Sequence, residues 1–557
     1  MKTSRIHFFY SLLIVLISSL TPAAAQISVP ETPVSRLKNL DTHSIPTVTI
    51  TAPDTEQLLR EDAFTDKYGI AMRFTQNQPT HTDLAKEGLW QQFADGSQMC
   101  RLAITSAGAQ ALILYYINFE IPAGAQLFLY DIEQFQIAGA FTSTNNRNGG
   151  SFATQMIYGA TTILEYYQPA GISGRPNIVI AEVGYVYRTA ETIYGIRGFG
   201  GSGFCEVNVA CSEGEHWQQQ AKGVTRIIVK QGTSSVWCSG SLLNNTLLDH
   251  TPWLLTADHC GPIASQTDMD QWVFYFKYQS PVCENPISDS AFRFYTIVGA
   301  TKVAAAGGAG IKSDFKLLLL NEAVPDDYEP FYNGWSAEGS PSAQGVTIHH
   351  PQGDIKKIST YTQPLISDNW GSTPETHWRV TWAQTPTNWG VTEGGSSGSP
   401  IFNPDGLIVG QLTGGTASCT QASSPDYYGK FSYSWDKGDS LPEHQLKPWL
   451  DPENMGVLAL GGITAITETA KPARNLTIYP NPSNGVAFIK LNEQNNTPIE
   501  IEVMDVSGRI IYRKTENFSS QITELDLRHL EHGIYFVKIS QGQRNIPVGK
   551  VVLSEVR

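Results

Sequence analysis

Short apolar runs separated by turn-forming residues recur along most of this 557-residue chain. Residues 111–119, 126–130 and 272–276 are rich in aromatic and β-branched side chains, and glycine, proline and asparagine stand between runs of this kind. Such runs are typical of β-strands. We therefore predict an all-β protein, in which the aromatic-rich residues 272–276 form a core strand rather than a cofactor site.

The pattern of apolar runs is interrupted at two places, which divide the chain into regions. Glycines fill residues 194–203, and residues 464–473 are typical of a linker. A chain of this length is too long for a single hydrophobic core. We predict a signal peptide over 1–25, an N-terminal β region over 26–197, a central domain over 198–462, a linker over 463–474 and a C-terminal domain over 475–557.

The C-terminal region alternates apolar and polar residues with a period of two. Residues 499–508 and 533–539 carry this alternation, and turn-forming residues separate the runs. Alternation of this kind predicts a small antiparallel, Ig-like β-sandwich.

The first residues have the three parts of a secretory signal. Lys2 and Arg5 give a basic start, residues 8–20 form an apolar run, and residues 23–25 are alanines that suit cleavage before Gln26. The apolar run is short for a membrane span. We prefer a cleaved signal to the alternative of a membrane anchor.

Charge and composition exclude some classes of partner. The formal net charge is −14, charged residues make up 16% of the chain, and no block of lysine and arginine is present to neutralise phosphates. The chain also lacks the CxxC pairs and HExxH helix of common zinc sites. We predict no nucleic-acid partner, no metal, no cofactor and a monomeric, extracellular protein.

Seven cysteines fit an oxidising compartment. One of them, Cys100, lies in the N-terminal region, and the others lie in the central domain. Six cysteines allow about fifteen pairings, so the residues alone do not select one. The six are Cys205, Cys211, Cys238, Cys260, Cys283 and Cys419.

A candidate nucleophile lies in the glycine-rich stretch at residues 394–400. Ser397 is flanked there by glycines and serines on a predicted tight turn, which can expose a hydroxyl and aim backbone N–H groups at a developing oxyanion. A candidate base, His259, follows an apolar strand and precedes a cysteine. A candidate acid, Asp314, stands at the start of an apolar run, where it can be buried and fixed.

These residues occur in the order histidine, aspartate, serine, which is the order of chymotrypsin-type proteases. Asp258 is a second acid on paper, but neighbouring strand residues point to opposite faces, so it is poorly placed to hold His259. We interpret His349 and His350, beside a proline and a glycine, as structural residues.

The motifs LLTADHC, SDFKLLLL, HHPQGDIKKIS, VTEGGSSGSP, GQLTGG and SPDYYGKFSYSW resemble those of the bacterial lysyl endopeptidases. The resemblance covers about residues 198–462. It implies a chymotrypsin-like double β-barrel and a secreted serine endopeptidase that cleaves after basic residues, preferably lysine, through a Ser-His-Asp triad and an acyl-enzyme. Its substrates would be proteins or peptides.

The resemblance also implies roles for individual residues. Gly395 and Ser397 would supply the oxyanion hole, Asp426 would lie in the specificity pocket, and Thr413, Gly414 and Gly415 would contact the substrate. The lysine-specific relatives carry histidine where this chain has Thr413, which leaves an arginine-accepting enzyme as an alternative. A catalytically inactive surface adhesin is the alternative from another class. The implied disulfides are Cys205–Cys419, Cys211–Cys283 and Cys238–Cys260.

The flanking regions have resemblances of their own. Residues 26–197 are placed like the propeptide of a secreted protease, with a permanent binding module as the alternative, and we expect maturation after Arg197. The motifs YPNPSNG, DVSGRIIY and GIYFVKI resemble the sorting domain of the type IX secretion system, with a spacer or carbohydrate-binding module as the alternative. This resemblance implies export through the periplasm and outer membrane, followed by secretion or attachment to the cell surface.

Overall fold

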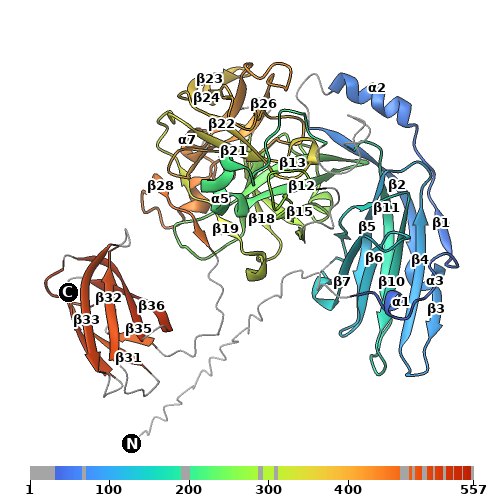
Figure 1. Ribbon diagram of the computed structural model, residues 1–557, viewed down its shortest axis with the longest axis horizontal. Coiled ribbons are helices and arrows are strands. Elements are labelled where there is room, and N and C mark those ends of the chain that lie inside the picture. Colours follow the sequence, from blue (N-terminus) through green and yellow to red (C-terminus); the bar gives the residue numbers. More distant parts are fainter. Residues whose placement is uncertain are drawn as a thin grey trace, which may run out of the picture. The chain divides into compact units, whose positions relative to one another are not determined.

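The structure is a computed structural model of the chain. It describes residues 32–65, 71–147, 149–189, 201–286, 293–306, 312–438 and 440–464, and in the C-terminal part residues 476–479, 483–491, 498–505, 509–517, 522–530, 532–541 and 544–553. The chain divides into two compact units, residues 1–465 and residues 466–557. Figure 1 shows that strands dominate both units.

The N-terminal region consists of two β-sheets that enclose an aromatic-rich core. Tyr115, Tyr116, Phe119 and Tyr166 are among the fully buried side chains of this core. One sheet has the order β1-β4-β10-β6-β7, with β3 beside β4, and the other contains β2, β11, β5, β8 and β9. The strands are β1 (Thr47–Thr49), β2 (Arg73–Asp83), β3 (Leu89–Gln92), β4 (Gln98–Thr105), β5 (Ala111–Glu120), β6 (Gln126–Tyr130), β7 (Ile137–Phe141), β8 (Phe152–Ala153), β9 (Ile157–Tyr158), β10 (Thr161–Gln168) and β11 (Asn177–Val186).

The first half of the central domain is an antiparallel sheet that turns back on itself. Its order is β16-β15-β12-β13-β14-β18-β17, and its two end strands are consecutive in the chain, separated by Gly299 alone. Gly299 has a φ of +85°, which favours glycine, so β16 and β17 are two pieces of one bent strand. The strands are β12 (Val224–Gln231), β13 (Ser234–Leu243), β14 (Trp253–Ala257), β15 (Val273–Phe276), β16 (Tyr295–Val298), β17 (Ala300–Ala305) and β18 (Phe315–Leu320).

The second half repeats this arrangement. Its order is β22-β21-β25-β26-β27-β24-β23, and the end strands β22 and β23 are again consecutive, separated by residues 362–365. β20 (Trp335–Ser336) and β28 (Ala459–Leu460) extend this sheet beside β26. The seven strands are β21 (Gly345–His349), β22 (Lys357–Tyr361), β23 (Ile366–Trp370), β24 (Thr373–Val380), β25 (Pro400–Phe402), β26 (Ile408–Gly415) and β27 (Asp426–Lys430).

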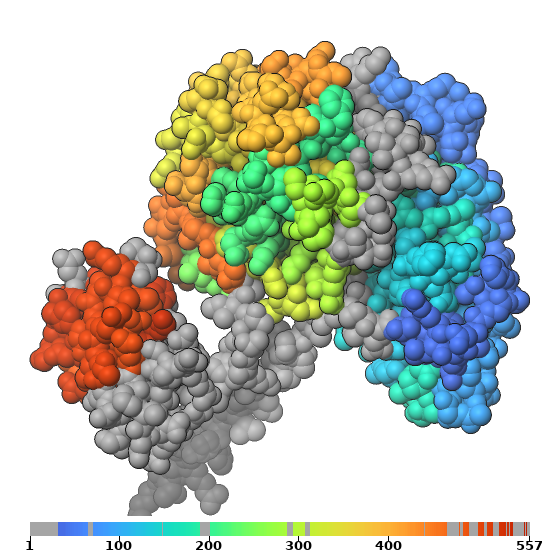
Figure 2. Space-filling view, in the orientation of Figure 1, coloured from blue at the N-terminus to red at the C-terminus, as the bar shows by residue number. Residues whose placement is uncertain are grey.

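Each half therefore contains six strands, one of them bent into two pieces, in the same cyclic order of neighbours. Among the described residues, hydrogen bonds between strands do not close either ring, and the bent strand joins the two ends instead. This arrangement confirms the predicted fold class, an all-β, chymotrypsin-like protein with two barrel-like halves. Figure 2 shows the first half, in green, beside the second half, in yellow and orange.

The N-terminal region is joined to the first half through a shared strand edge. β2 pairs with β13, with Gln76 opposite Ser234 and Thr75 opposite Ser235. Beside this pairing the ring of Phe74 stacks on Trp237, with 3.9 Å between ring centroids. The two regions consequently form one compact unit.

Short helices connect the sheets, and none of the helices that the structure describes is long and apolar enough to cross a membrane. They are α1 (Val34–Leu37), α2 (Thr55–Thr65), α3 (Leu84–Glu87), α5 (Gln218–Gly223), α6 (Gln266–Met269), α7 (Phe431–Asp436) and α8 (Lys447–Leu450).

The C-terminal unit consists of two sheets, as the alternation of its residues predicts. β30-β31-β34 form one sheet and β33-β32-β35-β36 the other, around a core that includes Ile489, Val503 and Val537. The strands are β30 (Leu476–Tyr479), β31 (Val486–Leu491), β32 (Pro498–Met504), β33 (Ile510–Asn517), β34 (Ile522–Asp526), β35 (Gly533–Gln541) and β36 (Arg544–Leu553).

The structure extends the first unit slightly beyond residue 462. β29 (Ile463–Thr464) pairs with β19 (Phe331–Tyr332), and Ile463 packs against the core of the first half. The first two residues of the expected linker thus complete a small sheet.

Candidate active site

His259 and Asp314 are brought together by two paired strands. His259 follows the end of β14 and Asp314 precedes the start of β18, and in the pairing of these strands Ala257 lies opposite Phe315. The ring atom Nδ1 of His259 lies 2.7 Å from Oδ2 of Asp314, and the backbone N–H of His259 donates to Oδ1 at 3.0 Å. The carboxylate therefore holds both the ring and the main chain of the histidine.

Asp314 adopts a backbone conformation that few residues other than glycine accept. Its φ is +55°, in the left-handed region that aspartate tolerates better than most residues. Two hydrogen bonds fix the main chain at this point: the N–H of Asp258 donates to the Asp314 carbonyl at 2.7 Å, and Nε2 of Gln411 donates to the Ser313 carbonyl at 2.6 Å. Gln411 belongs to β26, so the second half helps to set the position of this acid.

The pair is buried and electrostatically coupled. Burial alone would raise the pKa of Asp314, but the charge of His259 and the hydrogen bonds from His259 and Thr413 outweigh it and hold that pKa below its usual value. Burial alone would likewise lower the pKa of His259, and the Asp314 carboxylate outweighs it, so the pKa of His259 is raised. An ionised aspartate stabilises the imidazolium that forms when this histidine accepts a proton.

Ser397 lies on the loop that leads into β25 and contacts Cys260, the residue that follows His259. Its carbonyl accepts a hydrogen bond from the N–H of Ser239 at 2.8 Å, and Sγ of Cys260 lies 3.8 Å from the same oxygen. Within the described residues, Nε2 of His259 is buried and has no hydrogen-bond partner, and no bond joins it to the Ser397 hydroxyl. The serine loop therefore contacts the disulfide that follows His259, and Nε2 of His259 is free to accept a hydrogen bond.

The backbone N–H groups of Gly395 and Ser397 are also uncommitted in the described part of the chain, because the hydrogen bonds found there include neither as a donor. Gly395 has a φ of +93°, and a Cβ at this position would lie 2.9 Å from the backbone nitrogen of Gly353. Glycine is thus required for this turn. The two N–H groups have the chemistry that an oxyanion hole needs.

Residues behind the serine loop support it, and one of them, Ser239, lies in none of the quoted motifs. The hydroxyl of Ser239 donates to the Gly395 carbonyl at 3.0 Å and accepts from the N–H of His350 at 3.0 Å. Nδ1 of His349 lies 2.8 Å from the hydroxyl of Ser396, and burial lowers the pKa of His349 to about 3. His349 and His350 are therefore neutral, buried supports of the loop.

Asp426 is a buried carboxylate that neutral groups surround. Nε1 of Trp382 and the hydroxyl of Thr392 both donate to Oδ2 at 2.7 Å, and the N–H of Ala417 donates to Oδ1 at 3.1 Å. Burial raises the pKa of Asp426 to about 6, although these hydrogen bonds oppose the shift. No lysine or arginine among the described residues forms an ion pair with it. Sequence reasoning gave no signal for Trp382, and Thr392 lies in the motif VTEGGSSGSP without an assigned role.

Gly414 and Gly415 lie at the end of β26, next to Asp426. Gly415 pairs with Asp426 in the sheet, and the atom nearest to a Cβ built on Gly415 is Oδ1 of Asp426. A side chain at this position would therefore cover the carboxylate. Thr413 differs from the two glycines because its side chain is buried and its hydroxyl contacts His377, with 2.9 Å between Oγ1 and Nε2.

Asp258 lies apart from the ring of His259. Its Oδ1 is 3.7 Å from Nζ of Lys316, and that ammonium group also donates to the carbonyls of Cys260 at 2.7 Å and Gly261 at 3.2 Å. The Asp258 and Lys316 pair thus supports the histidine loop from behind, and Asp314 holds the ring.

Three disulfides connect segments around the site, and they are the pairs that the family resemblance implies. Cys238 pairs with Cys260, Cys205 with Cys419 and Cys211 with Cys283, and Cys100 is free and buried.

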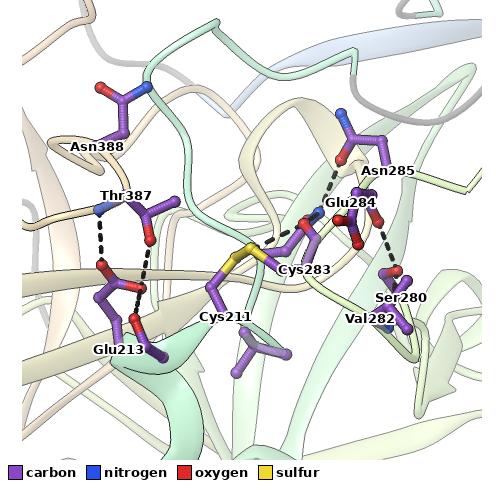
Figure 3. The surroundings of a disulfide bond; sticks show 12 residues. Cys211, Glu213, Ser280, Val282, Cys283, Glu284, Asn285, Thr387 and Asn388 are labelled. Carbon is purple, nitrogen blue, oxygen red and sulfur yellow. Dashed lines mark hydrogen bonds between the residues drawn. A yellow bond between two sulfur atoms is a disulfide. The ribbon is translucent and has the colours of Figure 1, made fainter.

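Figure 3 shows the surroundings of the Cys211–Cys283 disulfide. Nearby, the carboxylate of Glu213 accepts hydrogen bonds from the hydroxyl of Thr387 at 2.9 Å and from its N–H at 3.1 Å. These bonds connect the start of the central domain to the loop that precedes the candidate nucleophile. Among the described residues, no group of three or more histidine, cysteine, aspartate or glutamate side chains is placed to hold a metal ion.

Models of three protein families match this chain. The lysyl endopeptidase C-terminal domain matches residues 199–429, the lysyl endopeptidase N-terminal domain matches residues 49–180, and the secretion system C-terminal sorting domain matches residues 477–554. The lysyl endopeptidase of Pseudomonas aeruginosa is 30% identical over 372 residues, which cover 62% of this chain and 75% of that protein.

Two solved structures also align with the chain. The protease Anisep from Arthrobacter nicotinovorans is 18% identical, with 38% of this chain and 90% of that chain covered and a TM-score of 0.28. A Glu endopeptidase is 14% identical, with 38% and 86% covered and a TM-score of 0.24. The fold is defined by the strand order of the two halves.

The fold and the family matches define a serine endopeptidase. The chain belongs to the lysyl endopeptidase family. Its sorting domain indicates export followed by secretion or attachment to the cell surface, with the type IX secretion machinery as a partner.

Proposed function

We propose that the enzyme cleaves peptide bonds after lysine with Ser397, His259 and Asp314 as its catalytic triad. Ser397 attacks the scissile carbonyl, His259 accepts its proton and passes it to the leaving amine, and Asp314 orients His259 and stabilises the imidazolium. The N–H groups of Gly395 and Ser397 stabilise the oxyanion. The observation that carries this proposal is the 2.7 Å contact between His259 and the buried Asp314, beside the loop of Ser397.

The choice of lysine follows from the hydrogen bonds of Asp426. An ionised carboxylate has about four acceptor positions. The side chains of Trp382 and Thr392 donate to Oδ2, the N–H of Ala417 donates to Oδ1, and the backbone of Thr392 also stabilises the charged form. These donors leave little room on the carboxylate for a further one. A compact ammonium group bonds as a point charge and suits such a site, whereas a guanidinium group binds best when both carboxylate oxygens are open.

Desolvation adds a reason for a cationic substrate. A buried carboxylate without a partner of opposite charge is unfavourable, as the raised pKa of Asp426 indicates. A lysine side chain that enters the pocket removes this penalty, whereas a neutral side chain leaves it in place. The pocket thus selects a basic residue through a charge that the free enzyme does not neutralise.

We further propose that residues 26–197 are a propeptide that ends at Arg197. Met72, which precedes β2, lies against the serine loop, with its Cβ 3.2 Å from the position of a Cβ built on Gly394. The residues after the junction belong to the protease region instead: the hydroxyl of Ser202 donates to Asp354 at 2.7 Å, and the N–H of Gly203 donates to Glu393 at 3.0 Å. Cleavage of the chain at Arg197 would allow Met72 to leave the serine loop, and the hydrogen bond of Ser202 would stay intact.

Replacing the proposed nucleophile tests the triad. In the matured Ser397→Ala enzyme we expect no covalent labelling by a fluorophosphonate probe and a fall in kcat of at least roughly 10³-fold, because the attacking oxygen is gone. Labelling is measured by mass spectrometry and kcat with a lysyl amide substrate.

Ser372→Ala is the matched control, because Ser372 is an exposed serine in the turn between β23 and β24. It should label and turn over as the natural enzyme does. Equal labelling of Ser397→Ala and of the control would assign the nucleophile to another residue.

A pair of substrates that differ only in lysine or arginine tests the pocket. We expect kcat/KM for lysine to exceed that for arginine by roughly tenfold, the effect of one lost charge-assisted hydrogen bond. Asp426→Asn should lower kcat/KM for both substrates by roughly a hundredfold or more, because the cation then enters a pocket without a charge. Equal rates for lysine and arginine would favour the arginine-accepting alternative.

The pH dependence gives a control for the same pocket. The carboxylate attracts lysine only when it is ionised, so this attraction is present above pH 6 and is lost as the pH falls through the pKa of Asp426, about 6. Asp426→Asn should remove this step and keep the step that reports protonation of His259, whose pKa is raised. An unchanged acid limb in Asp426→Asn would contradict the assigned role.

The N-terminal sequence of the secreted, active enzyme tests the propeptide. We expect it to begin at Gly198, because cleavage after Arg197 separates Met72 from the protease region and leaves the bonds of Ser202 and Gly203 intact. Edman sequencing or mass spectrometry gives the answer directly. An active enzyme that begins before residue 190 would instead support a permanent N-terminal module.

A further inference from the structure

We propose that Arg226 is a positioning residue for the oxyanion hole, which it supports through the turn at residues 350–354. The inference rests on the proposed function of the Gly395 and Ser397 N–H groups. Arg226 lies in β12, outside the sequence motifs, and its guanidinium group bonds to the backbone of the turn rather than to the triad.

The guanidinium group of Arg226 is buried among aromatic rings. Arg226 is 2% exposed, and in the described part of the chain no carboxylate forms an ion pair with it. Its Cζ atom lies 3.5 Å from the ring centroid of Tyr278 and 4.0 Å from that of Tyr275. The ring centroid of Trp237 is 4.6 Å away. A buried cation is unfavourable unless other groups stabilise it, and the faces of aromatic rings do so here.

The hydrogen bond of this cation holds the turn. Nη1 of Arg226 donates to the carbonyl of Gly353 at 2.8 Å, and a bond with a charged donor is stronger than one between neutral groups. Trp237 packs on the same residue, because a Cβ built on Gly353 would lie 2.6 Å from two atoms of its ring. Gln352 and Gly353 have φ values of +56° and +69°. A left-handed glutamine is costly, so the turn needs contacts of this kind to keep its shape.

The turn in its place fixes the direction of the Gly395 N–H group. The N–H of Gln352 donates to the carbonyl of Gly394 at 2.6 Å. That carbonyl and the N–H of Gly395 belong to one planar trans peptide unit, so they point in opposite directions and turn together. The carbonyl that bonds to the turn therefore directs the Gly395 N–H away from the turn, as an oxyanion donor requires.

Ser239 supports the same loop at other peptide units. Ser239 lies opposite Arg226 in the pairing of β12 with β13, so the two side chains share one face of the sheet. The hydroxyl of Ser239 donates to the carbonyl of Gly395 at 3.0 Å, and its N–H donates to the carbonyl of Ser397 at 2.8 Å. These bonds hold the units that follow Gly395 and Ser397. The unit that precedes Gly395 is the one held by the turn.

The contacts of Arg226 are independent of maturation and of pH. Gly353 and the three rings belong to the central domain, so cleavage after Arg197 removes none of them. Arginine stays protonated throughout the range in which proteins are active. Without the guanidinium group the buried carbonyl of Gly353 has lost its charged donor, the turn is held less firmly, and the Gly395 N–H is aimed less precisely at the oxyanion.

A matched pair of inhibitors tests the proposal in the secreted, active enzyme. A peptidyl lysinal forms a hemiacetal with Ser397 whose oxygen occupies the oxyanion hole, whereas the corresponding lysinol binds without forming that bond. In Arg226→Met we expect the Ki of the lysinal to rise, and kcat on a lysyl amide to fall, by roughly tenfold or more, the cost of one bond from a charged group. The Ki of the lysinol and KM should each change less than twofold.

Two further variants control this measurement. Arg226→Lys keeps a cation that can donate, so it should lose less than Arg226→Met, and it provides the same test if the methionine variant does not fold. Arg293→Met is the matched control, because Arg293 is exposed and also lies over an aromatic ring, 4.9 Å from the ring centroid of Tyr295. Its Ki values should equal those of the natural enzyme. Thermal unfolding is measured for each variant, and the pH profiles should keep their midpoints.

The ratio of the two Ki values decides the outcome. An unchanged ratio in the Arg226 variants, or an equal loss of lysinal and lysinol binding, would overturn the proposal. The natural enzyme separates this result from a failure of the proposed function. If it binds the lysinal no more tightly than the lysinol, the proposed nucleophile and oxyanion hole are themselves wrong.

Discussion

The burial of one ionised carboxylate, that of Asp314, is the constraint on which the rest of the site depends. A buried charge is tolerated only when hydrogen bonds and an opposite charge compensate it. Here the N–H and the ring of His259 and the hydroxyl of Thr413 provide that compensation. The lowered pKa of Asp314 and the raised pKa of His259 are two results of the same interaction.

This constraint explains why the site needs both halves of the domain. The first half brings His259 and Asp314 together at the ends of β14 and β18, and the second half supplies Gln411 and Thr413 from β26. Ser397 comes from the second half and is bonded through its carbonyl to Ser239 of the first. The Cys238–Cys260 disulfide lies at this junction and restrains the histidine loop against β13.

The sequence predicts the all-β fold class, the sandwich at the C-terminus and the candidate residues His259, Asp314 and Ser397, because strand periodicity and the triad motifs are local signals. The prediction of Asp426 comes from the family resemblance. The contacts of three residues, Ser239, Trp382 and Thr392, join distant segments and are not indicated by the local sequence pattern. Ser239 lies in an ordinary strand, and only the folded sheet shows that its hydroxyl contacts the serine loop. Trp382 and Thr392, both in the connection between β24 and β25, donate to Asp426.

Thr413 shows most clearly what the periodicity of the sequence does not predict. The motif GQLTGG predicts a strand that contacts the substrate, and a regular alternation would place Thr413 on one face of it. The bulge between Leu412 and Gly414 changes that alternation, and the buried side chain of Thr413 contacts His377. A one-residue shift in pairing reverses the direction of a side chain, and periodicity alone does not reveal it. Similarly, the sequence places Ile463 and Thr464 in a linker, whereas in the structure they pair with β19.

The most direct measurement of the central claim is the pKa of His259, observed by NMR titration of its ring in the matured enzyme and in the Asp314→Asn variant. In the natural enzyme the charge of Asp314 outweighs burial, so we expect a pKa above the ordinary value of 6.5. In Asp314→Asn the main raising effect is gone, and burial together with the charge of Lys316 outweighs the smaller effect of Asp258, so the pKa should fall below 6.5. A pKa of 6.5 or lower in the natural enzyme, or the same pKa in both proteins, would contradict the claim that a buried, ionised Asp314 controls this site.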